Sequence, residues 1–123
     1  MRLADNAFDR GEYELSRSYI KTVKLTGIGK QSNVNLCYVY YLDTMCLIML
    51  LQSKLQSNQV TPSEINELYS LFAEAEMLMT SEDSQEFLQV IEQQIHLFEK
   101  RTGYRYDSTM YEGNKELINY TCD

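Results

Sequence analysis

The sequence predicts an all-α domain of about five helices, paired as antiparallel hairpins around one central hydrophobic helix. The first observation is a continuous apolar run, Leu36–Leu51, which only Asp43 and Thr44 interrupt. A helix that is hydrophobic on every side must be enclosed by other elements or by lipid. The second observation is that the other apolar residues recur at spacings of three and four, which is typical of helices with one buried face. Such one-sided helices are suited to covering the central one.

Length and charge limit the classes of function. A chain of 123 residues is large enough for one domain with a single core. Its 18 acidic and 11 basic residues give a net charge of −7, and the basic residues are scattered singly. A nucleic-acid surface needs clustered positive charge, so we expect no nucleic-acid partner. The acidic surface either favours a basic peptide partner or only aids solubility.

The cysteines predict a reducing compartment. The chain has three of them, Cys37, Cys46 and Cys122, and two lie within the apolar run, where cysteine behaves as a small hydrophobic residue. An odd number does not suggest a disulfide framework. The amino-terminal residues contain no apolar segment typical of a secretory signal. We therefore expect no disulfide and a cytoplasmic location.

Two helices are predicted at the amino end, over residues 3–10 and 13–25, separated at Gly11. Glycine accepts the left-handed conformation that is common just after a helix. The second helix has lysines near its carboxyl end, where the helix dipole favours positive charge. The inner faces of the pair combine small residues with bulky ones: Ala4, Ala7, Phe8, Tyr13, Ser16, Ile20 and Val23.

This pattern resembles one tetratricopeptide repeat, in which two antiparallel helices pack closely because small residues alternate with large ones. The matching positions are Ala4-x-x-Ala7-Phe8-x-x-Gly11-x-Tyr13-x-x-Ser16-x-x-x-Ile20-x-x-Val23. The chain departs from the family's pattern in four ways: Ala7 replaces the usual tyrosine, Ser16 the usual alanine, Val23 is larger than the expected alanine, and no proline follows the second helix. The resemblance implies a right-handed stack of hairpins. It also implies a concave binding surface lined by the first helix of each hairpin, here those beginning near Leu3, Val34 and Glu82.

A turn over Thr26–Asn33, with a cap at Ser32 or Asn33, leads into the predicted central helix over residues 34–57. Its 24 residues span roughly 36 Å, which is longer than the first helix of a regular repeat. The apolar run within it is shorter than the roughly 20 residues that a membrane span needs, and it contains Asp43. We therefore expect a buried core helix and no membrane partner.

Two further helices follow. Thr61, Pro62 and Glu64 form a capping-box pattern that begins a helix ending near Met79. The fifth helix is expected over residues 82–101, ending in positive charge before Gly103. We thus expect a single domain of three hairpins over residues 1–25, 34–79 and 82–120. The third is incomplete or serves as a cap, with a short helix over residues 115–120.

Asp43 is the position that most invites a functional interpretation. A carboxylate inside an apolar helix needs a partner or a wet face, because an unpaired buried charge is costly. Three partners are open: the Thr44 hydroxyl, the tyrosine hydroxyls, or a basic residue from a neighbouring helix. One interpretation places Asp43 on the polar edge of its helix. The other places Asp43, Tyr40, Tyr41 and Asn35 together in a groove that binds a peptide.

The sequence contains no enzyme signature, and we expect no catalytic activity, metal or cofactor. His96 is the only histidine, and no cysteine stands near it at ligand spacing. Glycine-rich phosphate loops, HExxH and nucleophile elbows are absent. We expect a cytoplasmic protein- or peptide-binding module, the scaffold or sensor part of a regulator. The alternative is a closed helical bundle that self-associates as a homodimer.

Overall fold

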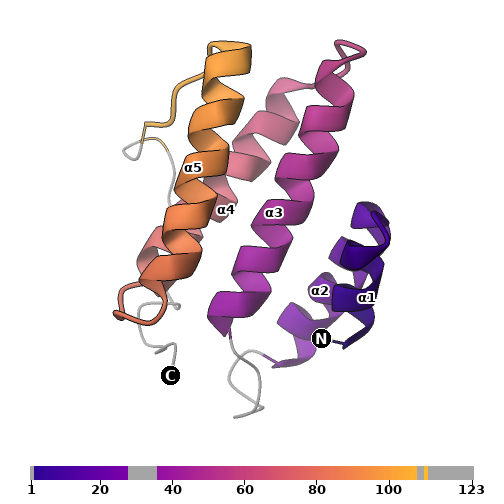
Figure 1. The fold of residues 1–123 in the computed structure, drawn as a ribbon, viewed down its shortest axis with the longest axis vertical. Coiled ribbons are helices and arrows are strands. Elements are labelled where there is room, and N and C mark those ends of the chain that lie inside the picture. Colours follow the sequence, from indigo (N-terminus) through magenta and orange to yellow (C-terminus); the bar gives the residue numbers. More distant parts are fainter. Residues whose placement is uncertain (1, 28–35, 108–109, 111–123) are drawn as a thin grey trace.

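The protein is all-helical, as a computed structural model shows for residues 2–27, 36–107 and 110 (Figure 1). Within these residues there are five α-helices and no strand. The prediction of an all-α chain is therefore confirmed. The helices are α1 (Arg2–Asp9), α2 (Tyr13–Gly27), α3 (Leu36–Leu55), α4 (Pro62–Leu78) and α5 (Gln85–Thr102).

The first two helices form a tight hairpin. Gly11 joins them with a φ of +76°, a left-handed conformation that glycine adopts without strain. Ala4 and Ala7 are fully buried. The Ser16 hydroxyl donates a hydrogen bond of 2.8 Å to the carbonyl of Ala4, so the serine both fits and bridges the close contact between the helices. α2 continues to Gly27, two residues beyond its predicted end.

α3 is the helix on which the others assemble. It packs against α2, α4 and α5, and Figure 1 shows it between α5 and the α1–α2 hairpin, with α4 behind. Its residues contribute to both hydrophobic cores, one shared with α4 and α5 and the other with α1 and α2. By length and composition α3 could cross a membrane, but 61% of its apolar window is buried inside the protein. Other helices therefore cover most of the apolar run.

Local capping chemistry determines where α4 begins. The backbone N–H of Glu64 donates to the Thr61 hydroxyl at 3.3 Å, and the Thr61 N–H donates to the Glu64 carboxylate at 3.1 Å. Pro62 occupies the first turn. The predicted capping box is confirmed, because each group satisfies a donor that the helix leaves free.

α5 begins three residues later than predicted, at Gln85. The preceding residues form a turn held by two serines: the Ser84 hydroxyl donates to the carbonyl of Ser81 at 2.8 Å, and the Ser84 N–H donates to the Ser81 hydroxyl at 3.3 Å. These bonds compete with the first helical turn. At the other end Gly103, with a φ of +83°, donates its N–H to the carbonyl of Glu99.

The cysteines differ from the prediction. Cys46 is a buried free thiol, but Cys37 is disulfide-bonded. The prediction that no disulfide forms is wrong. Because disulfides persist mainly in oxidising compartments, the cysteine count gives no support to a cytoplasmic location. The predicted cap at Ser32 or Asn33 and the short helix over residues 115–120 also lie outside the described residues.

Candidate functional site

Asp43 lies in the interior, held by two cations. Its side chain is only 7% exposed. The Arg17 Nε donates to one carboxylate oxygen at 2.7 Å, and the Lys24 Nζ donates to the other at 2.6 Å. Both cations come from α2. Of the partners that the sequence left open, the basic residue from a neighbouring helix is therefore the one observed.

These charges belong to a larger polar cluster that joins α2, α3 and α4. Arg17 also donates to Glu67 of α4 at 2.7 Å, and the Lys24 ammonium lies 3.8 Å from the centre of the Tyr40 ring. Burial lowers the pKa of Arg17, but the charges and hydrogen bonds of Asp43 and Glu67 outweigh it, and the net shift is upward. The Arg17 cation is thus stabilised inside the fold.

Tyr40 is enclosed in the same cluster. It is 3% exposed, and its hydroxyl is hydrogen-bonded to Glu74 of α4. Burial, followed by the charge and hydrogen bond of Glu74, raises its pKa, so the phenol stays neutral and acts as a donor. Asp43 and Tyr40 therefore present almost no surface to a partner. Asn35, the fourth residue of the predicted groove, lies outside the described residues.

Tyr41 lies on the opposite side of α3, in a cluster of half-buried aromatic rings. Its ring centre is 4.9 Å from that of Phe87 in α5 and 6.2 Å from that of Tyr38. Tyr38 in turn lies 6.0 Å from Phe87, and its hydroxyl donates to Asp5 of α1 at 2.5 Å. The cluster therefore joins α1, α3 and α5.

Two half-exposed methionines extend this cluster along α3. Tyr38, Tyr41, Met45, Met49 and Gln52 are separated by three, four, four and three residues, so they lie on one face of the helix. All five are only partly buried. We call the apolar part the Tyr–Met face: Tyr38, Tyr41, Met45 and Met49 of α3 with Phe87 of α5.

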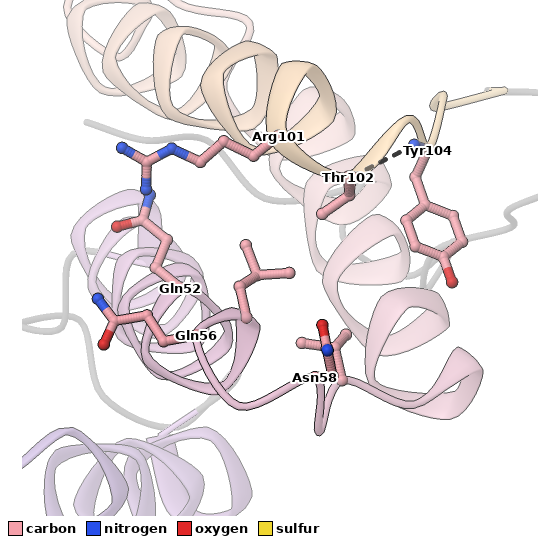
Figure 2. A pocket seen from close by; sticks show the side chains of 8 residues that line it. Gln52, Gln56, Asn58, Arg101, Thr102 and Tyr104 are labelled. Atoms are coloured by element: carbon pink, nitrogen blue, oxygen red, sulfur yellow. Dashed lines mark hydrogen bonds between the residues drawn. The ribbon is translucent and has the colours of Figure 1, made fainter.

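A polar pocket of about 460 Å³ lies at the carboxyl end of the Tyr–Met face (Figure 2). Figure 2 shows the Arg101 side chain of α5 beside Gln52 of α3, with Asn58 and Tyr104 across the opening. Asn58 adopts a φ of +54°, which asparagine tolerates better than most residues. The full lining is Gln52, Leu55, Gln56, Asn58, Val60, Arg101, Thr102 and Tyr104.

The described residues contain no group of three or more His, Cys, Asp or Glu side chains placed to hold a metal ion. The side chain of His96 is 74% exposed and lies 3.6 Å from the Glu99 carboxylate. The charged residues near Asp43 are already satisfied by one another. The Tyr–Met face and the pocket at its end are therefore two features of the described residues that are available for function.

Comparisons with known proteins return no match: no protein-family model, no curated protein and no solved structure matches this chain.

Proposed function

We propose that this domain is a protein- or peptide-binding module without catalytic activity, and that its partner docks on the Tyr–Met face. The observation that carries the proposal is the row of half-exposed tyrosine, methionine and phenylalanine side chains along α3 and α5. Tyrosine offers a large rigid contact area with a polar end, and methionine adapts its shape to a partner. Aromatic residues are also enriched among those that contribute most to binding.

We also propose that the helices form a stack of hairpins like that of tetratricopeptide repeats. Two features support the stack. α3 packs against α5, the first helix of the next hairpin, as well as against its own partner α4. The Tyr–Met face is bordered by α1 and α5, and the resemblance implies that the first helices line the binding surface. Of the four residues of the predicted groove, Tyr41 is the one that belongs to the proposed binding face.

A second copy of the chain is the competing occupant of the same face. A partly exposed apolar strip favours self-association as well as partner binding. Size-exclusion chromatography with light scattering distinguishes the two. The proposal expects a monomer at micromolar concentration, whereas a dimer that Met49→Glu dissociates would favour the self-associating bundle.

Photo-crosslinking followed by binding measurements tests the proposal. A photoreactive amino acid at Met49, on the face, is compared with one at Met77, a half-buried methionine of α4. The captured partner is then purified and titrated against Met49→Glu and Met77→Glu. We expect at least tenfold weaker binding for Met49→Glu and no change for Met77→Glu. Equal binding by the two variants would contradict the proposal.

A further inference from the structure

One end of the Tyr–Met face is acidic. Asp5 accepts the hydrogen bond from the Tyr38 hydroxyl, and Asp9 lies one helical turn further along α1. Burial, followed by the hydrogen bond and the charge of Asp5, raises the pKa of Tyr38, and Tyr41 and Asp9 add smaller contributions. Within residues 2–27, 36–107 and 110, neither carboxylate has an ion-pair partner within 4.0 Å.

The other end of the face is basic. Arg101 lines the pocket beside Gln52, and the pocket's lining includes no aspartate or glutamate although the chain has 18 acidic residues. Arg101 also forms no ion pair with any described residue. Carbonyl groups at the carboxyl ends of α3 and α5 carry partial negative charge that opposes an anion here, and of these the carbonyls of Lys54 and Glu99 accept backbone N–H groups.

The distance between the two ends is that of a short helix. Tyr38 and Gln52 are 14 positions apart on α3, so they are separated by about 21 Å at 1.5 Å per residue. The residues between them on this face, Tyr41, Met45 and Met49, carry no charge. A straight apolar strip on a helix accepts the ridge of a second helix, with anchors at spacings of three and four.

We infer that the partner presents an amphipathic α-helix of about 14 residues, with a lysine or arginine at one end of its apolar face and an aspartate or glutamate at the other. This inference rests on the proposed function and specifies the chemistry of the partner. The basic end lies near Asp5 and Asp9, and the acidic end lies near Arg101. Because a helix can lie on the face in either direction, the two charges are required but their order along the partner chain is not.

Three synthetic helical peptides with the same apolar face test the inference. One carries a lysine at one end and a glutamate at the other, the second carries lysine at both ends, and the third carries glutamate at both ends. Titration by fluorescence anisotropy at low salt is expected to show the mixed peptide binding most tightly. The expected advantage is about fivefold over each of the others, since exposed charge pairs contribute little each and are screened by salt.

A charge reversal on the protein supplies the decisive comparison. Arg101→Glu is expected to make the double-lysine peptide the tightest ligand. Lys100→Glu changes the net charge equally at the neighbouring exposed position, which lies outside the pocket, and is expected to leave the order of the peptides unchanged.

Several results would overturn the inference. They are equal affinity for the three peptides, tightest binding of the double-lysine peptide by the unmodified protein, the same reversal by Lys100→Glu, or no binding of any peptide. None of these decides the proposed function, which the comparison of Met49→Glu with Met77→Glu decides separately.

Discussion

Replacing Asp43 by asparagine should strongly destabilise the fold. The substitution keeps the shape of the side chain but removes the negative charge that Arg17 and Lys24 share. Removing one partner of a fully buried ion pair costs about 3–5 kcal/mol, because the remaining charge is left unpaired. Here the side chains of Arg17 and Lys24 are 23% and 18% exposed, and Arg17 keeps its contact with Glu67. Water and Glu67 therefore reduce the expected loss to about 2–3 kcal/mol.

Urea unfolding followed by circular dichroism at 222 nm measures this loss. For a small domain the free energy of unfolding changes by about 1–3 kcal/mol per molar urea, so Asp43→Asn should lower the midpoint by about 1 M or more. Glu67→Gln is the matched control. Its side chain is 49% exposed, and we expect a loss below about 1 kcal/mol. A loss for Asp43→Asn no larger than that for Glu67→Gln would refute this account of the cluster.

A triple variant separates unpaired charge from lost packing. Asp43→Leu combined with Arg17→Met and Lys24→Met removes Asp43 and both of its cationic partners and keeps apolar volume. Buried ion pairs replaced in this way are often neutral or more stable. We expect the triple variant to regain at least about 1 kcal/mol relative to Asp43→Asn. A triple variant as unstable as Asp43→Asn would show that the unpaired cations are not the cause.

The remaining predictions concern burial, pH and thiol chemistry. Ile48→Ala, at a fully buried position, should cost about 2–5 kcal/mol in urea unfolding, whereas Met49→Ala on the half-exposed face should cost clearly less. The hydrogen bond from Lys54 lowers the pKa of Glu64 in the folded protein. The contact between Lys54 and Glu64 therefore stabilises the fold when the pH is above the pKa that Glu64 has in the unfolded chain. This stabilisation is lost as the pH falls through the lower pKa of the folded state. Glu64→Gln should therefore be less stable than the unmodified protein at pH 7, and the difference in the free energy of unfolding should close as the pH falls below the lowered pKa of Glu64; a constant difference would contradict this. Burial raises the pKa of the Cys46 thiol, so Cys46 should react with a thiol reagent at pH 8 only as fast as the domain unfolds, and rapid reaction in the native state would contradict it.

Local sequence signals predicted the helices well, because the interactions that begin and end them are local. Thr61, Pro62 and Glu64 are close together in the chain, and their capping box forms as the pattern indicates. The start of α5 was missed because acidic residues near Glu82 also suit a helix start. The hydroxyls of Ser81 and Ser84 instead bond the backbone into a turn.

The candidate site depends on contacts that no local pattern specifies. Arg17 and Lys24 are 26 and 19 residues from Asp43, so their pairing depends on how α2 packs on α3. The sequence required a partner for Asp43 without identifying it. Because the groove hypothesis grouped Tyr40 with Tyr41, it joined two adjacent residues that point to different sides of α3.

The Tyr–Met face could not be predicted from the sequence, for a different reason. α3 is apolar around its whole circumference, so hydrophobic periodicity cannot indicate which side other helices leave uncovered. The spacing of Tyr38, Tyr41, Met45 and Met49 is visible in the sequence, but it becomes informative only once the burial of the neighbouring positions is known. The disulfide at Cys37 was not predicted either, because an odd number of cysteines does not suggest a disulfide framework.

The central claim is that α3 has one side closed by buried ion pairs and an opposite, partly exposed side on which we propose that a partner docks. Methyl NMR of the methionine-labelled protein, titrated with the mixed-charge helical peptide, tests it most directly. Met45 and Met49 report on the Tyr–Met face, and Met77 and Met79 of the α4 region serve as internal controls. We expect saturable shifts of the Met45 and Met49 methyl signals, with those of Met77 and Met79 unchanged. Shifts confined to Met77 and Met79 would contradict the claim.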